Sequence, residues 1–268
     1  MKDIRYVILA GLVIGISLFF LSTPPSASAD KVVHETAVAQ SAIPPAITAA
    51  VNSPDRPAAD KERDDSRKPE QMMAFFGIKP GMEVADLWAG GGWTTELLAR
   101  IVGPTGKVYS QNSAMAGKFE AAEKAWKARA SEPGMTNVVE VSKPFDAPDL
   151  MAVGPNSLDV VIINLNYHDL VARNYDRAKV NAAVYKALKP GGIYGIIDNS
   201  AQKGSGARDA DTLHRIDEQY EIDEITKAGF KLVADADFLR NPKDDRTLPF
   251  WKMNHQQDRF VLKFAKPE

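Results

Sequence analysis

Three consecutive glycines follow an acid at the end of an apolar run, in the stretch Val84-Ala-Asp-Leu-Trp-Ala-Gly-Gly-Gly-Trp93. Glycine permits a tight turn and lets a ligand approach the backbone N–H groups closely. A helix-like segment from Thr94 to Val102 follows, and the N-terminus of a helix favours bound anions. The order strand, glycine turn, helix therefore predicts a nucleotide-type binding site beside Asp86. An ordinary tight turn is the alternative.

A second polar group follows the most apolar run of the chain, Leu158–Leu165, which ends in Asn164-Leu-Asn-Tyr-His-Asp169. Ligands of open α/β sheets bind outside the carboxyl ends of the strands. Tyr167, His168 and Asp169 are therefore candidate catalytic residues. A neutral imidazole at His168 can take a proton from a nucleophile, and Asp169 can orient it or act itself. Alternatively, His168 only holds the loop by hydrogen bonds.

The next strand-like run ends at Asp198-Asn199, which should lie on the same sheet edge. After the flexible loop Gln202–Arg208, His214 and Arg215 begin another segment. We expect Asp198-Asn199 and His214-Arg215 to close over a substrate, and His214 is the fourth candidate catalytic residue. A structural pair between Asp198 and His214 is the alternative. A metal site formed by these two residues with His168 and Asp169 is conceivable, but no metal is expected.

Strand-like and helix-like segments alternate along the chain. The expected strands are Glu83–Trp88, Lys107–Gln111, Val138–Val141, Leu158–Leu165, Ile193–Asp198, Lys231–Ala236 and Asp258–Phe264. The expected helices between them are Thr94–Val102, Met115–Ala130, Tyr175–Leu188 and about Asp211–Ala228. This alternation predicts an α/β, Rossmann-like three-layer sandwich. Because no helix separates the last two strands, we expect a seven-stranded, mostly parallel sheet with a C-terminal antiparallel hairpin.

The N-terminus has the pattern of a secretory signal. Lys2 and Arg5 flank the start of an apolar run, Tyr6–Leu21, and Ala27-Ser28-Ala29 offers a cleavage site. We expect a signal peptide over residues 1–29, export to the periplasm, and no stable membrane association after cleavage. The apolar run is short for a spanning helix, which needs roughly 17–25 residues, although an uncleaved anchor is the alternative.

The remaining chain divides by composition. Residues 30–57 are rich in Ala, Pro and Ser and predict a flexible linker with one short helix near Ile47–Val51, and residues 58–268 form the expected domain. The absence of cysteine excludes disulfides, thiol catalysis and thiolate metal sites. A net charge of −2 gives no sign of a dedicated nucleic-acid surface, so we expect a small-molecule partner.

From about Arg63 to Pro267, the sequence resembles a class I S-adenosylmethionine-dependent methyltransferase. The resemblance rests on the strand and helix order, on the entry Lys79-Pro-Gly-Met-Glu-Val-Ala-Asp86, and on Leu188-Lys-Pro-Gly-Gly192 before the fifth strand. More closely, the chain resembles a bacterial group of exported, predicted methyltransferases. The shared stretches are Arg67-Lys-Pro, FFGIKPG, DLWAGGGW, NLNYHD, TLHRID, LRNP-x-DDR and DRFVLKF.

The resemblance implies S-adenosylmethionine as cofactor, with its methionine portion against Asp86, Ala89, Gly90 and Gly92. The family usually has glycine where Trp88 stands, so a bulky ring there is expected to narrow or reshape the pocket.

The contacts expected for the adenosine portion of the cofactor depart from the family's usual pattern. An acid usually holds the ribose hydroxyls at the end of the second strand, where this chain offers Asn112 or Gln111. Asp146 follows the third strand, where the family places an acid near the adenine amine, although it could simply cap a turn. Asn164, at the end of the fourth strand, completes the expected cofactor contacts.

Three functions compete. The first is an exported methyltransferase acting on an unidentified small molecule. The second is a non-catalytic or degenerate ligand-binding protein with the same fold, which Trp88 and Asn112 favour. The third, a nicotinamide-dependent dehydrogenase, would need a third glycine at the Thr95 position and an acid after the second strand, and both are missing.

Overall fold

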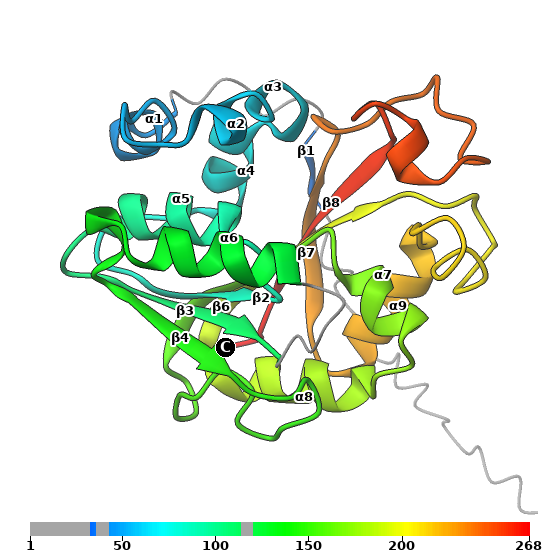
Figure 1. The fold of residues 1–268 in the computed structure, drawn as a ribbon. Coiled ribbons are helices and arrows are strands. Elements are labelled where there is room, and N and C mark those ends of the chain that lie inside the picture. Colours follow the sequence, from blue (N-terminus) through cyan, green and yellow to red (C-terminus); the bar gives the residue numbers. More distant parts are fainter. Residues whose placement is uncertain (1–32, 36–42, 114–119) are drawn as a thin grey trace, which may run out of the picture. The chain divides into compact units, whose positions relative to one another are not determined.

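The computed structural model describes residues 33–35, 43–113 and 120–268 (Figure 1). The predicted signal peptide, residues 1–29, lies outside them. A mixed sheet has the strand order β1-β7-β8-β6-β5-β2-β3-β4. Its strands are β1 (Val33–Glu35), β2 (Glu83–Leu87), β3 (Lys107–Asn112), β4 (Val138–Ser142), β5 (Leu158–Asn164), β6 (Leu188–Asn199), β7 (Lys231–Ala236) and β8 (Arg259–Ala265).

The predicted fold class is confirmed, with one addition at the sheet edge. Strand β8 pairs antiparallel with both β6 and β7, and all other neighbours are parallel. The eighth strand, β1, pairs its three residues with β7, from Val33 opposite Ala234 to Glu35 opposite Ala236. Three residues are too few to show a period in the sequence, so β1 was not expected.

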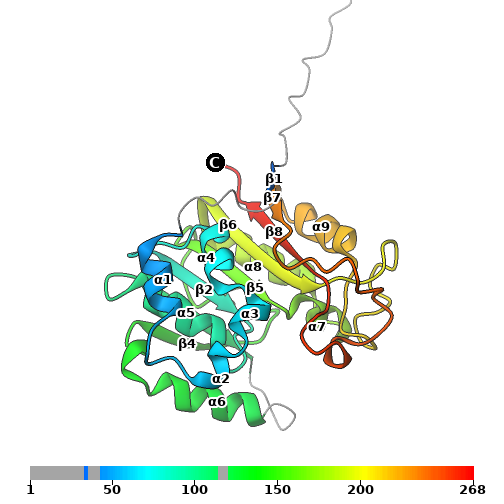
Figure 2. The same cartoon turned by 90° about the horizontal axis from the view of Figure 1, so that it is seen from above.

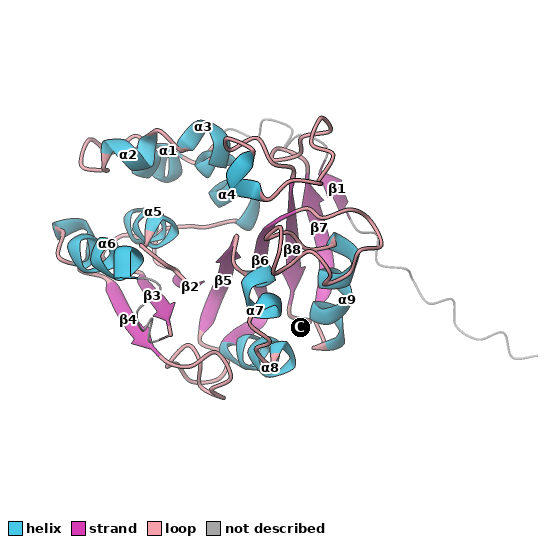
Figure 3. Cartoon of the chain, turned by 45° about the vertical axis from the view of Figure 1, so that its right-hand side comes forward, coloured by secondary structure: helices cyan, strands magenta, loops and turns pink. Residues whose placement is uncertain are grey.

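Helices cover both faces of the sheet (Figure 3). One face carries α1 (Pro45–Val51), α2 (Ala58–Lys61), α3 (Asp64–Arg67), α4 (Pro69–Phe76), α5 (Trp93–Val102) and α6 (Glu120–Ala130). The other carries α7 (Tyr167–Ala172), α8 (Arg177–Ala187) and α9 (Glu218–Lys227). Two 3₁₀ turns, η1 (Pro133–Met135) and η2 (Phe250–Lys252), lie in connecting segments.

Strand β5 shows why its sequence is almost continuously apolar. Val160 and Ile162 belong to the core beneath α4 and α5, while Val161 and Ile163 belong to the core beneath α7 and α8. Successive side chains of a strand point to opposite faces. A strand that is covered on both faces therefore needs apolar residues at every position.

Helix α1 is the short helix that was expected near Ile47–Val51, within the stretch predicted to be a flexible linker. It packs on α4 and α5 and buries Ile47, Ala50 and Val51. Their spacing of three and four residues puts all three on one helical face. Among the described residues, no helix is long and apolar enough to cross a membrane.

The run from Leu188 to Gly192 was expected as a turn before a strand, but it is an irregular start to β6. Leu188 pairs with Leu158, whereas Ile193 already pairs with Val160, so the register shifts between them. Gly191 has a φ of 74°, which a bulge of this kind requires.

Candidate functional site

A cavity of about 580 Å³ opens at the carboxyl ends of β2, β5 and β6. Strand β3, the next in sequence, lies on one side of β2, and the later strands β5 and β6 lie on its other side. This reversal of strand order is the point where open α/β sheets bind ligands. The predicted glycine turn and the predicted histidine cluster both line this cavity.

Asp86 and the glycine turn form one wall of the cavity. The hydroxyl of Thr95 donates to Asp86 Oδ2 at 2.6 Å, and Thr95 also contacts Ser110. Burial raises the pKa of Asp86 to about 7, against the hydrogen bonds from Thr95, which lower it. Gly90 has a φ of 56°, and no described atom lies within 4 Å of the place where its Cβ would be. No side chain therefore covers the Cα of Gly90 on this wall.

The indole of Trp88 is turned into the core beneath the turn. Trp88 has a φ of 58°, the left-handed region that favours the glycine expected at this position. Its ring centroid lies 4.4 Å from that of Phe145, the ring of Tyr175 meets it edge-on at 6.1 Å, and only 7% of the residue is exposed. The ring therefore borders the cavity without filling it, in contrast to the expected narrowing.

Asn112 fastens the glycine turn to β3. Its Oδ1 accepts from the Gly90 N–H at 2.9 Å, and its Nδ2 donates to the Gly90 carbonyl at 3.3 Å. Gln111 makes a similar connection, since its Oε1 accepts from the Trp88 N–H at 3.1 Å. These contacts give Asn112 a structural role behind the wall, and it does not line the cavity.

Two other expected cofactor contacts also lie outside the cavity. Gly92 caps α5 with a φ of 82°, and a Cβ there would come within 2.8 Å of the Trp126 ring. Asp146 is exposed to solvent, away from the cavity lining. Of the predicted cofactor residues, the cavity thus brings together Asp86, Trp88, Ala89, Gly90 and Asn164.

The opposite wall holds a cluster of imidazoles and carboxylates. His168 Nδ1 lies 2.6 Å from Asp198 Oδ1, and the His168 backbone N–H donates to Asp198 Oδ2 at 2.8 Å. His168 Nε2 lies 3.2 Å from His214 Nδ1 and 3.8 Å from Asp169 Oδ2. His214 Nδ1 is 3.5 Å from Asp169 Oδ1. Three of the four predicted catalytic residues are therefore in mutual contact.

The surroundings shift the pKa values of the two imidazoles in opposite directions. Burial alone would lower the pKa of His168, but the charge and hydrogen bond of Asp198, with the charge of Asp169, outweigh it and raise the pKa. Burial and the neighbouring His168 lower the pKa of His214, against the charge of Asp169. His168 is therefore the more basic of the two imidazoles.

Tyr167 is the predicted catalytic residue that the structure places elsewhere. Its side chain is fully buried, accepts from Asn181 Nδ2 at 2.9 Å and contacts Glu224 at 3.2 Å on the α8 and α9 side. The segment was expected to be a loop, but it forms α7, which turns neighbouring side chains by about 100°. His168 and Asp169 consequently face the cavity while Tyr167 faces the core.

A buried arginine fixes the loop that carries His214. Arg215 is fully buried, bonds Asp244 at 2.8 Å, and donates to the carbonyls of Leu248 at 2.8 Å and Ser200 at 2.9 Å. The loops at 200–217 and 237–258 therefore lie side by side (Figure 2). Phe250 from the second loop packs its ring 6.0 Å from His214 and lines the cavity.

The far end of the cavity is basic, because three arginines line it. Arg67 lies over the Trp93 ring at 4.6 Å, and burial, with the charges of Arg63 and Arg259, lowers its pKa to about 10 despite nearby Asp60 and Asp64. Arg63 and Arg67 both line the cavity. A group of cations in a cavity favours a negatively charged ligand group.

Sequence reasoning missed Arg129, which lines this end. It bonds Asp60 at 2.6 Å, contacts Glu96, and donates to the Gly91 carbonyl at 2.8 Å. Its partners lie at least 33 residues away in sequence, so no local pattern signals this role.

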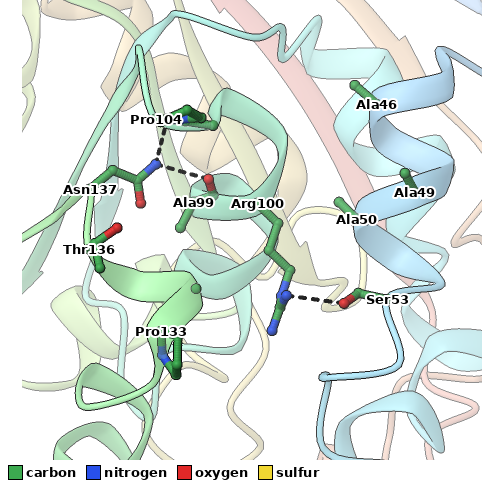
Figure 4. A pocket seen from close by; sticks show the side chains of 12 residues that line it. Ala46, Ala49, Ala50, Ser53, Ala99, Arg100, Pro104, Pro133, Thr136 and Asn137 are labelled. Carbon is green, nitrogen blue, oxygen red and sulfur yellow. Dashed lines mark hydrogen bonds between the residues drawn. The ribbon is translucent and has the colours of Figure 1, made fainter.

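A second hollow of about 440 Å³ lies at the other end of α5 (Figure 4). Alanines of α1 form one side, and Arg100 reaches across to Ser53 at 3.1 Å. Asn137 closes the other side by donating to the carbonyls of Ala99 and Gly103. Arg100, Ser53 and Asn137 are thus already engaged in hydrogen bonds within the protein, so this hollow has the character of a packing groove.

Comparison with known proteins agrees with this architecture. No protein-family model matches the sequence. A SAM-dependent methyltransferase from Aquifex aeolicus superposes with a TM-score of 0.56 at 19% identity, covering 79% of this chain and 98% of that one. The chain therefore shares the Rossmann-like fold of this methyltransferase.

Two further structures show the range of activities on this fold. An arsenic(III) S-adenosylmethionine methyltransferase from Chlamydomonas reinhardtii has a TM-score of 0.54 at 18% identity, covering 84% of this chain and 74% of that one. The [4+2]-cyclase SpnF has a TM-score of 0.55 at 15% identity, covering 78% of this chain and 82% of that one. The fold therefore does not fix the reaction, and the function has to be argued from the cavity.

Proposed function

We propose that this protein is an exported S-adenosylmethionine-dependent methyltransferase that acts on a small molecule. The observation that carries the proposal is the cavity beside Asp86, where open space adjoins the Cα of Gly90 and the Trp88 indole is packed on Phe145 instead of filling the cavity. A filled or collapsed turn would instead favour a degenerate fold.

The residues at this wall suit the cofactor. Asp86 would face the ammonium of its methionine portion, and the open space at Gly90 leaves room for close approach. Arg67 would pair with its carboxylate from the basic end of the cavity. When bound, S-adenosylmethionine supplies a methyl group that is already activated by its sulfonium. The protein then mainly has to align the acceptor with it.

The acceptor would lie towards His168, Asp169 and His214, at the opposite wall. Ligand cavities usually measure about 300–1,000 Å³, and this one must hold cofactor and acceptor together. The remaining space suits a small acceptor, beside the aromatic rings of Phe250 and Trp251. Export rests on the basic, apolar and small-residue pattern of residues 1–29.

Calorimetry of the full chain with S-adenosylmethionine and with S-adenosylhomocysteine tests the proposal. We expect saturable binding of both. Gly90→Val should abolish it by placing a branched side chain in the cavity. Gly77→Val is a matched control, because Gly77 also has a left-handed backbone, with a φ of 76°, and open space, but caps α4 outside the cavity.

The two variants separate the outcomes. Loss of binding in Gly90→Val alone supports the assigned site. Equal binding by both variants would show that the cofactor binds at another site. Absence of heat and of any thermal shift in the unmodified chain would refute the methyltransferase proposal in favour of a ligand-binding protein without this cofactor.

A further inference from the structure

We propose that His168, Asp169 and His214 form a binding site for one divalent transition-metal ion of the Zn²⁺ type. One imidazole nitrogen from each histidine and one carboxylate oxygen lie within 4.8 Å of one another. Two histidines and one carboxylate are a common donor set for such ions, including catalytic zinc, and the site needs no cysteine. The proposal does not depend on methyl transfer.

The spacing of the donor atoms suits a shared ion. In a tetrahedral zinc site, ligand atoms about 2.0–2.2 Å from the metal lie about 3.3 Å from each other. The separations here are 3.2 Å between His168 Nε2 and His214 Nδ1, 3.5 Å from His214 Nδ1 to Asp169 Oδ1, and 3.8 Å from His168 Nε2 to Asp169 Oδ2. The two carboxylate distances run to different oxygens of Asp169, so a rotation of this carboxylate would bring one of its oxygens beside both nitrogens and place all three donors around one ion.

Asp198 supplies the support that metal-binding histidines usually have. Its fully buried carboxylate lies 2.6 Å from His168 Nδ1 and also accepts the backbone N–H groups of His168 and Asn199. A carboxylate bound to one ring nitrogen fixes the orientation of the ring and leaves the other nitrogen to the metal. His168 Nε2 consequently points at His214 and Asp169.

Two buried oxygen atoms of the same region have no hydrogen-bond partner among the described residues. Asp169 Oδ1 is one, since His214 Nδ1 at 3.5 Å and Arg173 Nε at 3.9 Å are beyond good hydrogen-bond length. Asn199 Oδ1 is the other, on a residue only 2% exposed that lines the cavity. Unsatisfied buried acceptors call for a donor or a cation.

The remaining coordination positions face the cavity, because all three proposed ligands line it. The site is therefore of the open kind, in which a water molecule or a substrate atom completes the coordination. It also assigns the Nε2 lone pair of His168 to a metal, where the sequence alone suggested a proton acceptor.

Metal binding can be measured directly on the full chain. The chain is stripped with a chelator and titrated with Zn²⁺ against a chromophoric chelator, and the visible spectrum is recorded with Co²⁺. We expect one ion per chain and a Co²⁺ spectrum of low coordination number. His214→Ala should weaken Zn²⁺ affinity at least 100-fold and abolish that spectrum, as should Asp169→Asn.

Two comparisons keep the test decisive. His255→Ala removes an exposed histidine outside the cavity and should leave affinity and spectrum unchanged. Zn²⁺ should also raise the melting temperature of the unmodified chain but not of His214→Ala, whose side chain is partly exposed and tolerates truncation. Absence of Zn²⁺ binding, or full retention of it in His214→Ala and Asp169→Asn, would overturn the proposal. Neither result would bear on cofactor binding.

Discussion

Replacing Asp86 by asparagine should stabilise the protein in a way that grows with pH. Asp86 is 2% exposed, and burial raises its pKa from 3.8 to about 7. Between these values the folded protein keeps the carboxyl protonated while the unfolded chain has lost the proton. The stability that Asp86 contributes is therefore fully present below about pH 4 and is lost as pH rises through 7. Asparagine has no such loss, and its Oδ1 can still accept from Thr95.

The size of the effect follows from the shift. Each pKa unit corresponds to about 1.4 kcal/mol, so the unmodified chain should lose about 3 kcal/mol of stability through Asp86 between pH 5 and pH 9. Urea denaturation of both proteins across this range gives the free energy of unfolding at each pH. The difference between variant and unmodified chain should rise by that amount and level off above pH 7.

A matched variant isolates the cause. Asp149 is an exposed acid whose pKa is lowered, chiefly by its hydrogen bond with Lys143, so Asp149→Asn should not become more stabilising as pH rises. A flat difference for Asp86→Asn across the whole range would show that Asp86 is ionised in the folded protein at no cost, and the reasoning from burial would be refuted.

Three further substitutions test the packing around the cavity. Gly92→Ala should destabilise by at least about 2 kcal/mol in urea, because its Cβ would meet Trp126 at 2.8 Å in a left-handed turn, whereas Gly90→Ala should cost about half as much; equal losses would count against this. Arg129→Met should lower the free energy of unfolding by about 3–5 kcal/mol, since buried Asp60 loses its paired cation and buried Glu96 keeps only Arg100. Lys127→Met, on the exposed side of α6, should change it little. Glu221→Gln should raise the melting temperature at pH 8. Burial, with the charge of Asp198, holds the pKa of Glu221 well above its usual value, and neither carboxylate oxygen has a hydrogen-bond partner among the described residues. A lower melting temperature of the variant would contradict this prediction.

The strands were predictable because each is marked locally. The run Leu158–Asn164 is apolar on both faces, and the acid and glycines after β2 mark the end of a strand and the start of a helix. The hairpin of β7 and β8 followed from the lack of a helix between two apolar runs. These features depend on neighbouring residues only, so one sequence suffices to reveal them.

The side-chain arrangement at the cavity was only partly predictable. That His168 and Asp169 lie at the sheet edge followed from their place after β5, but the helical turn that separates them from Tyr167 did not. The contact between His168 and His214 joins residues 46 positions apart, and the bonds of Arg129 to Asp60 and Glu96 join residues 69 and 33 positions apart. Such contacts depend on how loops meet in space, which no periodicity encodes.

The left-handed backbone of Trp88 ties the ligand-facing turn to the opposite side of the sheet. A large residue at that φ is strained, and its stacking on Phe145 and Tyr175 offsets the strain. The turn therefore keeps its shape only while those rings remain in place. A mutation of Phe145, which does not line the cavity, would remove the support of Trp88 and loosen the glycine turn. The contact between Trp88 and Phe145 therefore makes this wall of the cavity sensitive to a mutation in the core on the other face of the sheet.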